Sequence, residues 1–188
     1  VLHQTGINYR LSSFYYLRKK KAFLAEHLNV FEHSIVDSGL FTLMFGGGSK
    51  KEIGEKELTK WLHDYIEWIN RHEWKNVSFV ECDVQKKLNP ESAWEFRKEM
   101  RAKIDARLKI INVYHLEDQN PDKLIEYADY IAISLLELRF NVSDKERYQI
   151  TKYIATKATL KGKKVHLLGC TEEQYLKDFD YCYSCDST

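Results

Sequence analysis

Short apolar runs rich in β-branched residues alternate with longer amphipathic runs along the whole chain. The short runs predict strands, and the longer ones predict helices because their apolar side chains recur every three or four residues. The clearest helix covers residues 55–71, where Leu58, Leu62, Tyr65, Ile66 and Ile69 share one face. The predicted strands are residues 7–12, 33–37, 77–83, 108–115, 130–136, 164–169 and 181–186. The other predicted helices are 14–29, 90–106, 121–128, 144–160 and a short one opening at residue 171.

Local signals fix several of these helix starts. Asn89-Pro90 and Asn120-Pro121 each combine an N-cap residue with a proline at the first helical position. Ser143 or Asp144 caps the helix over residues 144–160. These signals predict three helix starts to within a residue.

The alternation of seven strands with six helical segments predicts an α/β fold with right-handed crossovers and parallel strands. A doubly wound open sheet and a (β/α)8 TIM-type barrel both fit this order. No glycine-rich dinucleotide fingerprint follows any strand, which favours the barrel. A full barrel takes about 250 residues, so with Val1 at the start and Thr188 at the end we expect an incomplete barrel. No linker or repeat interrupts residues 1–188, which predicts one domain.

Composition narrows the classes of function. The 29 Lys and Arg residues against 28 Asp and Glu give a net charge of +1, which excludes nucleic-acid binding through bulk charge but allows a local basic face. No apolar run reaches the length of about 18 residues that a membrane span needs, so no membrane partner is expected. Four sparsely placed cysteines suit a reducing compartment, which predicts a cytoplasmic protein of the producing or infected cell.

Candidate chemistry gathers where the predicted strands end. In an α/β barrel the carboxyl ends of the strands carry the active site, and three of these ends are aspartates: Asp37, Asp83 and Asp186. Each could instead cap the helix that follows, and that reading stays open. If the three carboxylates converge at one mouth of the barrel, they fit glycosyl-transfer chemistry, in which paired carboxylates serve as nucleophile and acid/base. The remaining strand ends are His115, Glu137 and Gly169.

Four stretches together resemble a known family. They are Asp37-Ser38-Gly39-Leu40-Phe41, the predicted strand at residues 164–169 (KVHLLG), the terminal Tyr183-Ser184-Cys185-Asp186-Ser187-Thr188, and the opening YRLSSFYYL at residues 9–17. In their order and spacing these stretches resemble the tRNA-guanine transglycosylase superfamily. They are most similar to its phage-encoded relatives, which insert 7-deazaguanines into DNA. The tRNA enzymes have glycine where this chain has Leu40.

The resemblance implies a role for each matching residue. Asp186 corresponds to the nucleophile that attacks the sugar C1′ and expels guanine, and Asp37 to the aspartate that contacts the base and handles its proton. The remaining positions correspond to the base pocket: Asp83, Ser38, Gly39, His115, Leu136 and Glu137. The implied activity is replacement of guanine in DNA or tRNA by a 7-deazaguanine, after the target nucleotide leaves the stack. No metal or organic cofactor is implied, and a homodimer stays open.

The loop that follows the Asp37 strand carries the glycines at residues 46–48 and the cations Lys50 and Lys51, and Lys56 lies just beyond it, at the start of the helix predicted over residues 55–71. It lacks the spacing of a P-loop. Either it is an ordinary surface loop, or it is a lid whose lysines hold nucleic-acid phosphates.

Three other interpretations compete with base exchange. Cys182 and Cys185, with Cys170 and His166 upstream, suggest zinc, but no second CxxC completes four ligands, so alternating strand positions explain them better. A barrel that has lost its chemistry would act as a nucleic-acid-binding module. A retaining glycoside hydrolase would use Asp37 or Asp83 together with Asp186.

Overall fold

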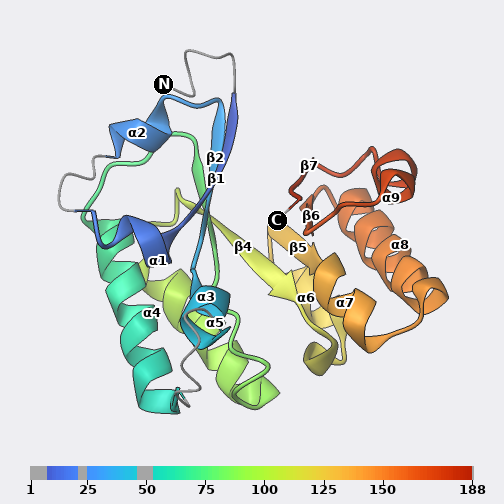
Figure 1. Cartoon of the computed structure of the whole chain (residues 1–188), viewed down its shortest axis with the longest axis horizontal. Coiled ribbons are helices and arrows are strands. Elements are labelled where there is room, and N and C mark those ends of the chain that lie inside the picture. Colours follow the sequence, from blue (N-terminus) through green and yellow to red (C-terminus); the bar gives the residue numbers. More distant parts are fainter. Residues whose placement is uncertain (1–7, 21–24, 46–52, 188) are drawn as a thin grey trace. The chain divides into compact units, whose positions relative to one another are not determined.

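The computed structural model describes residues 8–20, 25–45 and 53–187, and the chain divides into two compact units, Val1–Ile110 and Ile111–Thr188. Within each unit the strands are parallel and follow one another in sequence order, with helices between them (Figure 1). The predicted α/β class with parallel strands is therefore confirmed. None of the helices in the described residues combines the length and apolarity that crossing a bilayer requires.

The first unit contains the strands β1, β2 and β3, and β2 pairs with both of the others. Leu11 lies opposite Ile35, and Val36 opposite Phe79. The two long helices of this unit, α4 and α5, lie side by side (Figure 1). The elements are β1 (Tyr9–Ser13), α1 (Phe14–Leu17), α2 (Glu26–Asn29), β2 (His33–Asp37), α3 (Leu40–Phe45), α4 (Glu55–Asn70), β3 (Val77–Val80) and α5 (Pro90–Lys103).

Aromatic side chains of α1 and α4 form much of the core of the first unit. The ring of Phe14 lies 5.1 Å from that of Trp61 and 4.8 Å from that of Tyr65. Tyr65 in turn meets Phe79 of β3 edge-on at 6.5 Å, and its hydroxyl donates to the carbonyl of Val36 at 2.9 Å. The predicted apolar face of α4 is thus buried against the sheet, where burying each large side chain is worth about 1.5–3 kcal/mol.

The second unit contains the four strands β4 to β7, of which β5 pairs with β4 and β6, and β6 with β7. Helix α8 packs on β5 and β6 with Ile154, Ala155 and Ala158 buried, small side chains that allow a close approach. The elements are β4 (Lys109–Tyr114, with residues 111–114 in this unit), the 3₁₀ helix η2 (Leu116–Asp118), α6 (Pro121–Tyr127), β5 (Tyr130–Ser134), α7 (Leu135–Asn141), α8 (Asp144–Leu160), β6 (Lys164–Leu168), α9 (Glu173–Asp178) and β7 (Ser184–Cys185).

The three predicted helix starts are confirmed. The side chain of Asn89 accepts from the backbone N–H of Ser92, and that of Asn120 accepts from two backbone N–H groups at the start of α6. Ser143 caps α8 in a reciprocal arrangement: its Oγ accepts from the Glu146 N–H at 3.3 Å, while Glu146 accepts from the Ser143 N–H at 3.0 Å.

Several predicted boundaries are wrong. The helix predicted over residues 14–29 is not continuous, since α1 ends at Leu17 and α2 begins at Glu26. Directly after α1, two cations lie over aromatic rings: Arg18 over Trp61 at 4.5 Å and Lys19 over Tyr15 at 4.3 Å. The strand predicted over 130–136 ends at residue 134, where α7 begins, and the last strand covers Ser184–Cys185 alone.

The predicted (β/α)8 barrel is also wrong. The described residues supply seven strands, three in the first unit and four in the second, whereas the barrel closes with eight. Alternation of strands and helices dictates parallel pairing, but closure depends on strand number and stagger, which the alternation does not encode.

Candidate functional site

Polar side chains of the second unit follow the carboxyl ends of its strands. His115 comes directly after β4, Glu137 lies in the first turn of α7 after β5, Gly169 follows β6, and Asp186 follows β7. In parallel sheets this edge is where ligands bind, because helix starts and loops meet there (Figure 1). The edge carries two separate histidine–carboxylate pairs.

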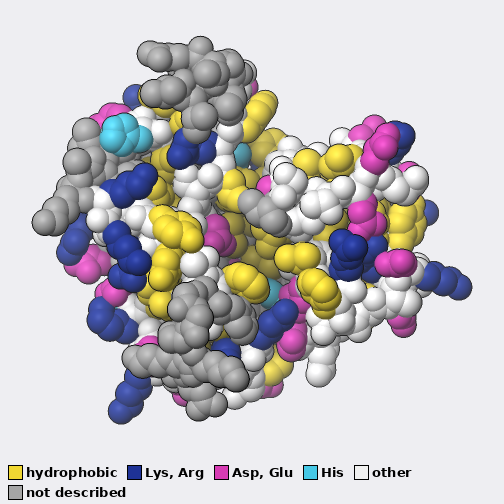
Figure 2. Space-filling model, in the orientation of Figure 1, with side chains coloured by type: hydrophobic (Ala, Val, Ile, Leu, Met, Phe, Trp, Pro, Cys, Tyr) yellow, Lys and Arg dark blue, Asp and Glu magenta, His cyan; other side chains and the backbone are white. Residues whose placement is uncertain are grey.

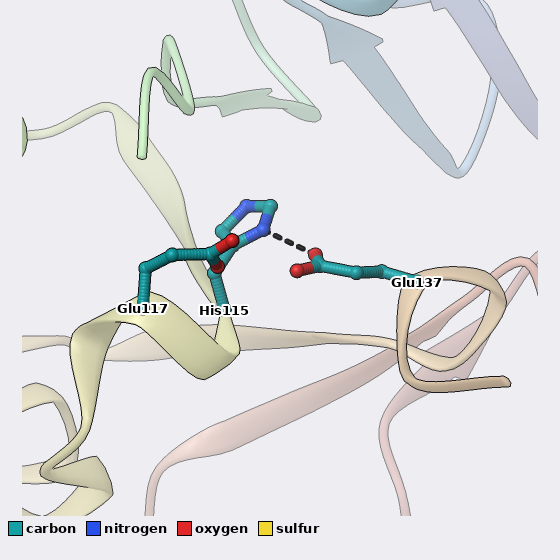
Figure 3. A group of neighbouring side chains, drawn as sticks. All are labelled: His115, Glu117 and Glu137. Atoms are coloured by element: carbon teal, nitrogen blue, oxygen red, sulfur yellow. Dashed lines mark ion pairs between the residues drawn. The ribbon is translucent and has the colours of Figure 1, made fainter. Parts of the chain in front are cut away.

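The first pair is His115 with Glu137, and Glu117 lies close to both (Figure 3). His115 Nδ1 contacts Glu137 Oε2, and the two side chains are 6% and 5% exposed. Glu117 projects from η2 toward the His115 ring, and the three residues offer donor atoms that all lie within 4.8 Å of one another.

The local sequence explains how η2 brings Glu117 to this place. The backbone N–H of His115 donates to Asp118 Oδ2 at 3.0 Å, which closes the turn Leu116–Asp118 directly after the strand. Glu117 was not predicted as a site residue. The sequence signal for Glu117 is the acidic pair Glu117-Asp118 just beyond the strand end. Asp can accept from backbone N–H groups of a turn there, and this edge of a parallel sheet is where ligands bind.

An imidazole and two carboxylates can perform two kinds of chemistry. They can move a proton, since histidine changes charge near neutral pH. They also form the nitrogen and oxygen donor set that divalent ions such as Zn²⁺ or Mn²⁺ bind. No metal site was expected from the sequence; among the residues that the structure describes, this cluster is the group of three donors that could hold an ion.

The second pair is Asp186 with His166. Asp186 Oδ1 accepts from the Gly169 N–H at 2.8 Å and lies 3.2 Å from His166 Nε2. The backbone of Asp186 is held as well, since its N–H donates to the Leu167 carbonyl at 3.1 Å and its carbonyl accepts from the Cys170 N–H at 2.7 Å. Asp186 is therefore fixed against β6 from both its backbone and its side chain.

Asp37 and Asp83 lie in the first unit, and both act on the buried thiol of Cys82. Burial raises the pKa of Cys82 well above its usual value, and the charges of Asp83 and Asp37 raise it further. Burial of the Tyr65 side chain likewise raises the pKa of its phenol, and the charges of Cys82 and Asp37 raise it further. Both carboxylates are thus close to Cys82, while Asp186 belongs to the second unit, so the predicted convergence of all three stays a prediction.

The Asp37-Ser38-Gly39 turn is held by its own side chains. Asp37 Oδ2 accepts from the Gly39 N–H at 2.7 Å, and Ser38 is fully buried. The Asp37 bond to Gly39 lies within the turn, just before α3 begins at Leu40. Gly39 has φ +70°, and a Cβ there would lie 2.6 Å from Tyr15 Cβ.

This geometry predicts a large cost for a methyl group at residue 39. We expect Gly39→Ala to lower the free energy of unfolding by about 2–5 kcal/mol, from positive φ and steric overlap together. The matched control is Gly162→Ala, since Gly162 has φ +72° but nothing within 4 Å of its would-be Cβ, so about 1–2 kcal/mol is expected. Urea denaturation of both variants measures the difference, and equal losses would contradict the close approach to Tyr15.

Three of the remaining predicted site residues take no part in these hydrogen-bonded groups or lie outside the described residues, and Leu136 directly precedes Glu137. Leu136 is 43% exposed at the start of α7, and Lys56 is exposed in the first turn of α4. Lys50 and Lys51 lie outside the described residues.

The cysteines of the second unit form no group of three metal donors among the described residues. Burial raises the pKa of Cys182 to about 12 and raises that of Cys170, whereas Cys185 is exposed. We therefore expect Cys185 to react with a thiol reagent at pH 8 well before Cys82, Cys170 and Cys182, because the thiolate is the reactive form. Mass spectrometry of the labelled protein follows the order, and Cys185→Ser should remove the fast phase; fast labelling of Cys182 would contradict its burial.

No protein-family model matches the chain, and no curated protein does.

Proposed function

We propose that this chain exchanges bases in a nucleic acid by double displacement, with Asp186 as the nucleophile. In the first step a carboxylate oxygen of Asp186 bonds to C1′ of the target nucleotide, the C1′–N9 bond breaks, and guanine departs with its bonding pair and a proton from a general acid. In the second step N9 of an incoming 7-deazaguanine loses its proton and attacks C1′, which releases Asp186. Two inversions retain the configuration at C1′.

The observation that carries this proposal is the anchored carboxylate of Asp186. It follows a parallel strand, at the edge of the sheet where ligands bind, and it is oriented by the Gly169 N–H and His166. A nucleophile needs such orientation, because a displacement of about 1 Å can cost about 100-fold in rate. The Ser184-Cys185-Asp186-Ser187-Thr188 segment is also the stretch that resembles the nucleophile strand of the transglycosylases.

Base recognition is assigned to the polar groups beside that edge and to the first unit. The buried His115 and Glu137 supply a donor and acceptors for the edge of a purine, with Leu136 beside them. By the resemblance, Asp83, Ser38 and Gly39 also contact the base and Asp37 handles its proton. Lys50, Lys51 and Lys56 are proposed to hold phosphates.

The proposed partners are DNA or tRNA and a free guanine or 7-deazaguanine, in the cytoplasm of the producing or infected cell. A monomer and a homodimer both fit this proposal.

The test is an exchange assay with radiolabelled guanine. The chain is incubated with labelled guanine and either unfractionated tRNA or guanine-containing duplex DNA, and the label in precipitated nucleic acid is counted. Incorporation that needs Asp186 supports base exchange. Binding of nucleic acid without incorporation would support the inactive binding module instead, and release of sugar from oligosaccharides would support the hydrolase.

A further inference from the structure

A continuous chain of hydrogen bonds runs from a buried tyrosine to the proposed nucleophile. Tyr130 Oη lies 2.6 Å from Ser184 Oγ, and Ser184 Oγ lies 2.7 Å from His166 Nδ1. The other nitrogen of the same ring, His166 Nε2, lies 3.2 Å from Asp186 Oδ1. The four residues come from β5, β6, β7 and the residue after β7, so the sheet itself fixes their spacing.

The chemistry of these groups sets the direction in which the hydrogen bonds donate. Burial raises the pKa of Tyr130 to about 12, so its phenol keeps its proton at neutral pH and can donate to Ser184. A serine hydroxyl has one proton, which Ser184 can then give to His166 Nδ1. The single proton of a neutral imidazole is thereby placed on Nε2, where it points at Asp186.

The opposite direction is electrostatically poor. If the proton of a neutral His166 were on Nδ1, the lone pair of Nε2 would face an oxygen lone pair of Asp186 at 3.2 Å. His166 is 1% exposed, so water cannot easily bridge that contact.

We propose that His166 is a positioning residue for Asp186, donating from Nε2–H to Oδ1 as a neutral imidazole whose tautomer is set by Ser184 and Tyr130. This inference rests on the proposed function only for its effect on turnover. With the Gly169 N–H, the imidazole gives Oδ1 two donors, which fixes the rotation of the carboxylate before attack. The same donors stabilise the carboxylate as it is released in the second displacement, and such preorganised donors are typical of sites where charge develops.

Two substitutions of His166 separate positioning from packing. The amide of Gln can occupy the place of Nε2 and donate to Asp186, whereas the shorter Asn reaches only the place of Nδ1. We expect His166→Asn to lower kcat for base exchange about 100-fold with KM nearly unchanged, and His166→Gln to recover much of that loss. If His166 had only a structural role, both variants would yield less folded protein, and their kcat values would not differ from each other.

A spectroscopic measurement tests the tautomer without any substrate. The ¹⁵N shifts of His166, assigned by comparison with His166→Gln, should show the Nε2–H form in the wild type at neutral pH. Ser184→Ala should move them toward Nδ1–H, and Tyr130→Phe should do so less. Cys185→Ala, a neighbouring exposed position, should leave them unchanged.

The two proposals fail in different ways. If the wild type incorporates label and His166→Asn does so at the same kcat, the positioning role is wrong while base exchange stands. If the ¹⁵N shifts show Nδ1–H or imidazolium in the wild type, the relay is wrong whatever the activity. If the wild type shows the Nε2–H form but incorporates no label, base exchange fails and the hydrogen-bonded relay remains.

Discussion

Replacing Asp186 with Asn is expected to lower base exchange by about 10⁴-fold or more, since a displacement cannot proceed without its nucleophile. The amide oxygen of Asn can still accept from the Gly169 N–H, so the position of the side chain should change little. Nucleic-acid affinity, measured by fluorescence anisotropy, should therefore stay close to that of the wild type, while incorporation of labelled guanine disappears.

The matched control for this variant is Asp180→Asn. Asp180 is an exposed aspartate of the same unit, six residues before Asp186. It should exchange bases at the wild-type rate. An Asp186→Asn protein with wild-type turnover would remove Asp186 from the chemistry.

The largest effect on stability is expected at Arg97. Its Nε donates to both oxygens of Glu81, at 2.9 and 3.1 Å, and both side chains are 1% exposed. Arg97→Ala leaves the Glu81 carboxylate buried without this partner, which should lower the free energy of unfolding by about 3–5 kcal/mol in urea denaturation.

Two further variants decide whether that loss comes from a broken ion pair. The double replacement Glu81→Leu with Arg97→Met removes both charges and should recover most of the loss. Lys98→Ala breaks an exposed pair with Glu95 on the same helix and should cost less than about 1 kcal/mol. A double variant as unstable as Arg97→Ala would show that lost packing, rather than an unpaired charge, sets the effect.

Charged side chains are widely distributed over the visible face of the protein, and yellow apolar areas lie between them (Figure 2). Exposed apolar side chains include Phe41, next to the Asp37 turn, at 67%, and Leu160, at the end of α8, at 82%. A net charge of +1 therefore reflects mixed charges rather than few of them, so the proposed phosphate contacts depend on local lysines.

The sequence predicted those elements whose signals are local. Asn89, Asn120 and Ser143 cap the helices as expected, because a cap depends only on a residue and its next few neighbours. The helices α3 and α7 were missed because each begins within three residues of a strand end, and the apolar run over 130–136 has no period that separates strand from helix.

The candidate site was predicted to a smaller extent. Asp37 and Asp186 were predicted as site residues because each stands where a strand ends, and those roles stay predictions. The link between His166 and Ser184 depends on their being opposite in the register of β6 and β7. Register is a property of pairing between distant segments, and a shift of one residue would turn His166 to the other face. Glu117 was missed for a related reason, since its side chain lies near His115 only because residues 116–118 form the short helix η2.

The most direct test of the account is to trap the covalent intermediate. The chain is incubated with a guanine-containing oligonucleotide without added base, quenched in denaturant, and analysed by intact-mass and peptide mass spectrometry. The account predicts an adduct whose mass equals the oligonucleotide minus guanine, attached at Asp186 and absent from Asp186→Asn. Base exchange that proceeds with an adduct at another residue, or an adduct that persists in Asp186→Asn, would contradict it.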